Sequence, residues 1–89
     1  MPRVIWTLGA RQHVEHIRKY ISQLSPLAAR RFALLLVTTG ESLSAYPMRG
    51  RPVSSGIRDL AIVAPYLIQY RLQNGVVEIL TIRHGAREA

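Results

Sequence analysis

Apolar residues in the first half of the chain recur every three or four positions. Between Ala10 and Leu24 the recurring apolar residues are Val14, Ile17, Ile21 and Leu24. This spacing places one apolar stripe along an amphipathic helix. Ser25 and Pro26 then supply a capping hydroxyl and a proline suited to the first helical turn. A second helix is therefore predicted from Pro26 to about Ser44, forming an antiparallel hairpin with the first.

In the second half the apolar pattern changes to a period of two. Such runs predict strands at Ile57–Val63, Tyr66–Gln73 and Val76–Arg83. Asn74 and Gly75 separate the last two runs, and this dipeptide is a strong signal for a two-residue hairpin. A short strand at Arg3–Leu8, ended by Gly9, is expected to join an edge of this three-stranded meander.

Proline, glycine and serine are frequent between Tyr46 and Gly56, which predicts a loop after the second helix. The predicted order is therefore β-α-α-β-β-β. It indicates an α+β fold of two layers, with a helix hairpin packed on a small antiparallel sheet. A chain of 89 residues has room for one such domain, expected to span residues 1–89.

Alternation along the predicted strands sorts their side chains into two faces. Tyr66 and Tyr70 share a face, and both are expected in the core or at its edge. In the last strand Ile79 is expected on the same side as Arg83 and opposite Ile82.

The charge of the chain narrows the classes of partner. Twelve basic residues against five acidic ones give a net charge of +7, and Lys19 is the only lysine. Such an excess on a small domain attracts nucleic acid or an acidic protein surface. Asp59 or Glu78 is expected to pair with arginines across the sheet.

Composition also excludes several kinds of site. The chain has no cysteine, which excludes disulfides, thiol catalysis and the usual ligands of structural zinc. His13 and His16 have a spacing that could hold a metal, but no third ligand is evident, so no metal or cofactor is expected. The longest apolar run, Phe32–Val37, is shorter than the about 20 residues of a membrane helix. A cytoplasmic protein without a membrane partner is expected.

Several stretches of the second half resemble the RelE/ParE toxin superfamily. They are Tyr46–Pro52, Gly56–Leu60, Pro65–Arg71, Val77–Leu80 and the closing His84–Arg87. Within the superfamily, the YPMRGRP…GIRDL passage and the closing RHGARE are similar to the ParE branch. The resemblance implies the toxin of a toxin–antitoxin pair. ParE-like members poison DNA gyrase, whereas RelE-like members cut messenger RNA on the ribosome.

The resemblance also implies the partners. A ParD-like antitoxin is expected to wrap the toxin with its acidic C-terminal segment, and operator DNA is expected to be bound only through that antitoxin. The ParE resemblance implies DNA gyrase as the target, and the candidate contact residues are Arg49, Arg51, Arg58, Arg71, Arg83, His84 and Arg87. For the antitoxin, the candidates are the apolar side chains of Val14, Ile17, Ile21, Leu34 and Leu35.

A RelE-like ribonuclease is the alternative. Attack by a 2′-hydroxyl needs a proton acceptor, a proton donor and cations that hold the phosphate. Arg87 matches a family arginine, and His84 lies where some members keep a histidine, so these two are the catalytic candidates. Tyr66 and Leu67, however, stand where the ribonucleases carry an arginine, and no lysine follows Lys19. A third reading is a domain that has lost toxicity and serves in operon repression.

Overall fold

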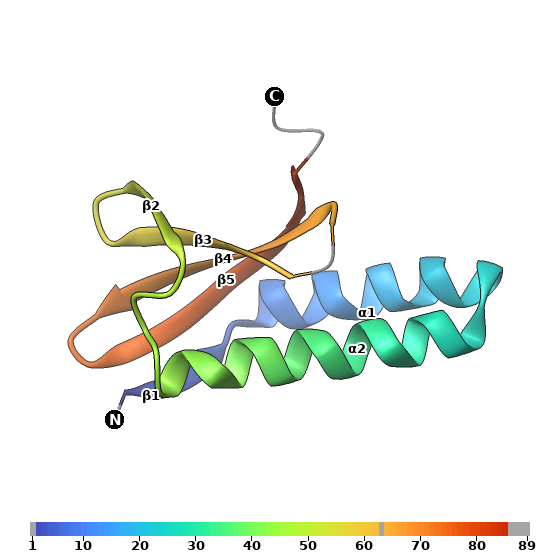
Figure 1. Cartoon of the computed structure of the whole chain (residues 1–89), viewed down its shortest axis with the longest axis horizontal. Coiled ribbons are helices and arrows are strands. Elements are labelled where there is room, and N and C mark those ends of the chain that lie inside the picture. The colour runs from blue at the N-terminus through green and yellow to red at the C-terminus, as the bar shows by residue number, and fades with distance from the viewer. Residues whose placement is uncertain (1, 63, 86–89) are drawn as a thin grey trace.

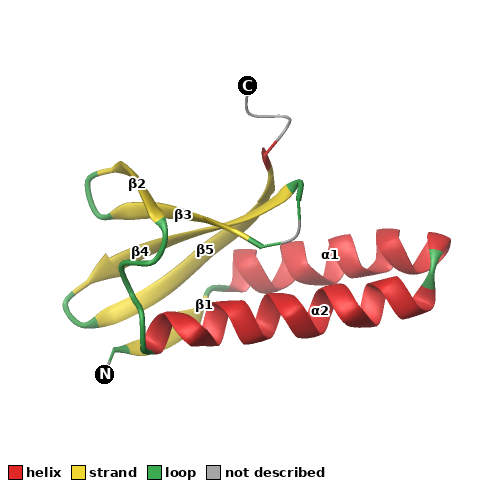
Figure 2. Ribbon diagram, in the orientation of Figure 1, coloured by secondary structure: helices red, strands yellow, loops and turns green. Residues whose placement is uncertain are grey.

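Two antiparallel helices cover one side of a five-stranded sheet (Figures 1 and 2). The computed structural model describes residues 2–62 and 64–85. The elements are β1 (Arg3–Trp6), α1 (Leu8–Leu24), α2 (Pro26–Glu41), a 3₁₀ turn η1 (Ser42–Ser44), β2 (Arg51–Ser54), β3 (Ile57–Ala61), β4 (Tyr66–Gln73) and β5 (Val76–His84). The predicted two-layer α+β fold is confirmed.

The sheet has the strand order β1-β5-β4-β3-β2. As predicted, the N-terminal strand joins the edge of the meander, where it pairs with β5. This pair is parallel, so the sheet is mixed and not purely antiparallel. The helix hairpin brings the chain back to the end where β1 starts. Strand β2 runs in the opposite direction to β1, and the three reversals that follow leave β5 running in the same direction as β1.

One strand lies inside the segment that was predicted to be a loop. Residues Arg51–Ser54 form β2, which pairs with β3 at the sheet edge. All four residues are exposed, so no alternation of buried and exposed positions marks the strand in the sequence. Pro52 is tolerated because an edge strand can lack one backbone donor. The pairing is also irregular between Pro52 and Ser54.

The helix boundaries follow their caps. Ser25 Oγ accepts a hydrogen bond from Ala28 N at 3.1 Å, which confirms the predicted start of α2. Thr7 Oγ1 accepts a hydrogen bond from Ala10 N at 3.1 Å, so α1 begins at Leu8. The prediction that Leu8 is the last residue of the first strand was therefore wrong. The regular part of α2 ends at Glu41, and η1 continues the chain to Ser44.

The hairpin turn between β4 and β5 is also confirmed. Asn74 and Gly75 both adopt positive φ angles, of 53° and 72°. This is the combination that a two-residue type I′ turn requires. Strand β4 has the predicted bounds, whereas β3 ends at Ala61, two residues before the predicted end.

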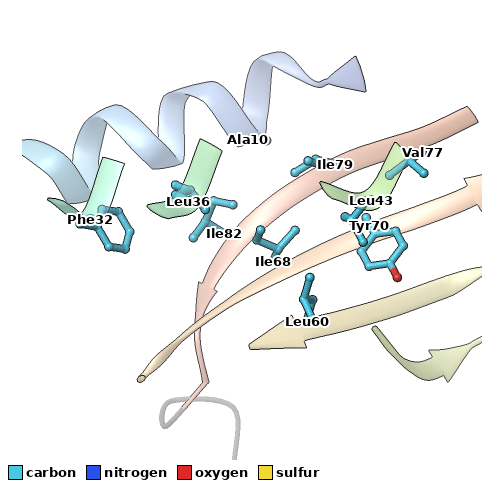
Figure 3. Packing of buried hydrophobic residues seen from close by; sticks show 10 residues of the cluster. All are labelled: Ala10, Phe32, Leu36, Leu43, Leu60, Ile68, Tyr70, Val77, Ile79 and Ile82. Carbon is cyan, nitrogen blue, oxygen red and sulfur yellow. The ribbon is translucent and has the colours of Figure 1, made fainter. Parts of the chain in front are cut away.

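The core lies between the sheet and the helix hairpin (Figure 3). Its largest fully buried side chains are Tyr70, Leu36, Leu43, Ile68, Ile79 and Val77. Tyr66 packs at the margin, with its ring 5.2 Å from that of Phe32. Both tyrosines thus lie in the core or at its edge, as expected.

A β-bulge in β5 corrects the predicted faces of that strand. Tyr70 pairs with Ile79 and Gln69 pairs with Thr81, which leaves Leu80 unpaired between them. The extra residue shifts the alternation by one position. Ile79 and Ile82 are consequently both buried in the core, and the prediction that they lie on opposite sides was wrong.

Charged side chains cover the outer surface of α1. The Arg18 guanidinium donates to the carboxylate of Glu15 and lowers the pKa of that carboxyl.

No helix in the described ranges has the length and apolarity needed to cross a bilayer.

Candidate functional site

The residues predicted to contact a target lie in three separate places. Arg49, Arg51 and Arg58 belong to the corner between α2 and β3. Arg71 and Arg83 lie on the sheet face away from the helices, and His84 lies on the helix side. Arg87 falls outside the residues that the structure describes.

At the corner, the three arginines differ in what their guanidinium groups do. Arg58 is half-buried, and its Nη1 donates to the carbonyls of Gly50 at 2.7 Å and Met48 at 3.2 Å. Arg49 is exposed and donates to Ser42 Oγ at 3.0 Å. Arg51 is exposed on β2. Arg58 therefore holds the loop backbone, and Arg49 and Arg51 face solvent.

On the open sheet face, both candidate arginines meet carboxylates. Asp59 is buried, and its carboxylate oxygens lie 3.4 Å from Arg83 Nη2 and 3.1 Å from Gln69 Nε2. Arg71 Nη1 lies 3.4 Å from Glu78 Oε1 in a more exposed pair. The prediction that Asp59 or Glu78 pairs with an arginine across the sheet is thus confirmed, and both carboxylates do so.

His84 lies opposite Tyr66 in the register of β4 and β5, with the two rings 5.5 Å apart and nearly perpendicular. It lines a pocket of about 320 Å³ between α1 and the end of the sheet, with His13, His16, Ile17, Tyr20, Tyr66 and Ile82. His84 Nδ1 is buried and has no hydrogen-bond partner among the described residues. His13 Nδ1 lies 2.6 Å from Thr81 Oγ1.

This pocket gathers all three histidines of the chain. Imidazoles can donate, accept or exchange protons near neutral pH. Within residues 2–62 and 64–85, however, no three ligand side chains are placed to hold a metal ion. The sequence hinted at the pocket only through the spacing of His13 and His16. The position of His84 in this pocket depends on how α1 packs beside β5.

The five apolar candidates for antitoxin contact divide between two environments. Val14, Ile17 and Ile21 on α1 pack against the core. Leu34 and Leu35 on α2 remain 70% and 41% exposed. Of these five candidates, the two on α2 are thus the ones left in solvent.

A groove of about 420 Å³ lies beside the start of α2. It is lined by Ile21, Ser25, Leu27, Ala28, Arg31, Phe32, Leu35, Ala64 and Tyr66. Leu27 is 54% exposed, and the Arg31 side chain adds a cation to this mostly apolar surface. Such a groove can receive the apolar face of a helical segment.

Comparison with known proteins gives consistent results. A family described as the ParE toxin of type II toxin–antitoxin system, parDE, matches residues 4–89. Toxin RelE2 of Caulobacter vibrioides is 48% identical over 87 residues, covering 98% of this chain and 99% of the relative. Toxin RelE1 of the same organism is 30% identical over 88 residues, covering 96% and 95%.

A solved structure has the same fold. It is titled as the chromosomal ParDE TA system from P. aeruginosa, and it matches with a TM-score of 0.80 and 25% sequence identity. The match covers 94% of this chain and 96% of that chain.

Proposed function

Because this chain belongs to the ParE toxin family of type II toxin–antitoxin systems, we propose that it arrests growth by inhibiting DNA gyrase and that a cognate antitoxin neutralises it. The observation that carries the choice of gyrase is the separation of His84 from the arginines of the open sheet face. RNA cleavage needs an acid or base beside cations that hold the phosphate. Here the histidines gather on the helix side, and Arg71 and Arg83 meet carboxylates on the other face.

The arginines that remain exposed support inhibition by surface contact. Arg49 and Arg51 are exposed at the corner between α2 and β3. An arginine fork binds carboxylates well and needs no reactive group nearby. The toxin therefore acts as a binding protein on its target.

The antitoxin occupies the surface of α2. The groove at the start of this helix and the exposed Leu34 and Leu35 offer an apolar track, and Arg31 lies beside it. An acidic amphipathic segment complements both features. Operator DNA is bound by the antitoxin and not by this chain.

The first experiment separates the two targets. The chain is expressed with and without the antitoxin from the neighbouring gene, and DNA synthesis and protein synthesis are followed separately. Early arrest of DNA synthesis, with inhibition of purified gyrase in a supercoiling assay, is the expected result. Rapid arrest of translation with cut messages contradicts it.

Relatives named RelE1 and RelE2 favour a second candidate, a ribosome-dependent ribonuclease. In that case His84 is the acid–base residue, and His84→Ala lowers the cleavage rate by about 10²–10⁴. His16→Ala, on the opposite wall of the same pocket, is the matched control. A growth arrest that survives His84→Ala without cut messages removes this candidate.

The antitoxin surface has its own test. Leu34→Asp places a charge on the exposed apolar track and repels an acidic partner. The variant is expected to bind the antitoxin at least about tenfold more weakly and to remain folded. Ser55→Asp adds the same charge in the exposed turn between β2 and β3, and it is the control. Equal affinity of the two variants contradicts the placement.

A further inference from the structure

The loop after η1 holds two large apolar side chains in solvent. Tyr46 and Met48 are 67% and 65% exposed, although smaller apolar residues elsewhere are buried. Together with Ser42, Pro47 and Arg49 they border an open hollow of about 670 Å³. Burial of these side chains in a partner would remove apolar surface from water, so their exposure on so small a protein indicates a contact site.

The backbone of this loop is held by hydrogen bonds from a core side chain. Tyr70 is fully buried, and its hydroxyl donates to the carbonyl of Pro47 at 2.7 Å and accepts from Gly50 N at 2.8 Å. Figure 3 shows the Tyr70 ring beside Leu43, with its oxygen directed away from the neighbouring core residues. A single buried side chain thus connects the sheet core to the loop.

Further contacts hold the rest of the loop. Arg58 binds the carbonyls of Met48 and Gly50, and Arg49 N donates to the carbonyl of Tyr46 at 3.1 Å. Gly50 has no room for a side chain, because a Cβ there would lie 2.7 Å from Tyr70 Cε1. The carbonyls of Tyr46, Pro47, Met48 and Gly50 are therefore all engaged.

A loop fixed in this way has little conformational entropy left to lose on binding. Tyr, Met and Arg are also the side chains enriched at the centres of protein interfaces. The exposed side chains of Tyr46 and Met48, on a loop that the core holds in place, are thus suited to contact with a partner and do not pack within the chain.

We infer that Tyr46, Met48 and Arg49, with Arg51 on the adjoining strand, form a preorganised docking surface for an acidic protein surface that offers an apolar recess. The inference rests on the proposed function, since the partner is the toxin's target. Arg49 and Arg51 are exposed and favour carboxylates, and Tyr46 and Met48 fill the recess. A nucleic acid would instead favour a track of cations with stacking aromatics.

The docking surface is distinct from the antitoxin groove. The groove extends along α2 from Ser25 to Leu35, about three turns, whereas the loop follows the end of that helix. Figure 1 shows the two ends of α2 at opposite ends of the helix layer. The two surfaces share no lining residue, and Leu35 at the near end of the groove lies six helical residues, about 9 Å, before the end of α2 at Glu41. Target and antitoxin can therefore be disturbed independently.

The test replaces both apolar side chains and measures binding to the target and binding to the antitoxin separately. The double variant Tyr46→Ala/Met48→Ala is expected to lose growth arrest and to bind the target about tenfold or more weakly. Its affinity for the purified antitoxin and its melting temperature should match those of the wild type. Leu24→Ala, which shortens an exposed apolar side chain outside both surfaces, is the matched control and should leave growth arrest and antitoxin binding unchanged.

A second variant tests the preorganisation. Tyr70→Phe keeps Tyr46 and Met48 but removes both hydrogen bonds of the hydroxyl. It is expected to weaken target binding at a temperature where the protein is fully folded, with antitoxin binding unchanged.

Full growth arrest in the double variant overturns the inference. So does a loss of binding to single-stranded RNA with protein binding intact, which would make the partner a nucleic acid. If the wild-type chain fails to inhibit purified gyrase, the proposed function fails, and the growth arrest of the double variant still decides whether the loop is the docking surface.

Discussion

At the residue scale, Asp59 and Glu78 each hold an arginine across the sheet, but they differ in their access to water. The Asp59 side chain is 5% exposed and the Glu78 side chain is 40% exposed. A buried carboxylate loses its hydration on folding and depends on its partners, whereas an exposed one does not. Similar ion pairs are thus expected to contribute unequally to the free energy of unfolding.

Asp59→Ala is expected to lower the free energy of unfolding by about 1–3 kcal/mol, because Arg83 and Gln69 lose a shared buried acceptor. Glu78→Ala is the control and should cost less than about 1 kcal/mol, since its pair is exposed. Urea unfolding of both variants measures the difference. Equal costs would contradict the role of burial.

Replacement of Gly40 by alanine is expected to lower stability, which is the opposite of the usual effect in a helix. In an exposed helix interior, Gly→Ala stabilises by roughly 0.5–1 kcal/mol. Gly40 is buried in α2, and a Cβ there would overlap the ring of Trp6 and lie 3.1 Å from Ile79 Cδ1. Gly40→Ala is therefore expected to destabilise the protein by about 1–3 kcal/mol. Thr38→Ala, at an exposed site two residues earlier, is the control in thermal unfolding.

At the scale of elements, Ser25 joins the two helices as a cap for both. Its backbone N–H donates to the carbonyl of Ile21 at 2.9 Å, and its Oγ accepts from Ala28 N at 3.1 Å. One residue thus ends α1 and starts α2, so the turn of the hairpin is sharply defined.

Ser25→Ala is expected to lower the free energy of unfolding by about 0.5–2 kcal/mol, because the first turn of α2 loses its side-chain cap. Ser22→Ala is the matched control. Its hydroxyl donates to Lys19 O within α1 and caps no helix end, so a change of less than about 0.5 kcal/mol is expected. Chemical denaturation of both variants compares them, and a larger loss in Ser22→Ala would contradict the capping role.

At the scale of the whole molecule, the net charge of +7 acts on association. The pairs of Asp59, Glu78 and Glu15 offset some arginines, but Arg49 and Arg51 at the corner and Arg30 and Arg31 on α2 remain exposed. The field of these exposed charges steers an acidic partner toward the toxin.

The association rate with the antitoxin is therefore expected to fall by about tenfold or more between 50 mM and 500 mM salt. The dissociation rate should change much less, because it depends on the desolvated apolar contacts. Stopped-flow or surface-binding kinetics measure both rates. An association rate independent of salt would contradict electrostatic steering.

The local elements could largely be predicted from the sequence. The helices, the cap at Ser25, the hairpin at Asn74 and Gly75 and the bounds of β4 all follow from patterns within a few residues of each other. Strand β2 could not be predicted, because none of its side chains is buried. The bulge at Leu80 was missed because an unpaired residue is defined by the partner strand.

The candidate site was less predictable. The arginines at the corner were named as candidate contacts with the family resemblance in view, but only the structure shows that Arg58 binds the loop backbone while Arg49 and Arg51 face solvent. The pocket of three histidines was missed, since His84 lies 68 residues after His16.

The sequence by itself determined the order of elements, the net charge and the family, because periodicity, caps and turn residues act locally and motifs are read in order. Only the tertiary structure decided which apolar residues stay in solvent, which arginines are engaged and on which face His84 lies. These properties depend on distances between residues far apart in the chain. The packing of α1 and α2 on the sheet sets those distances, and side-chain chemistry alone does not.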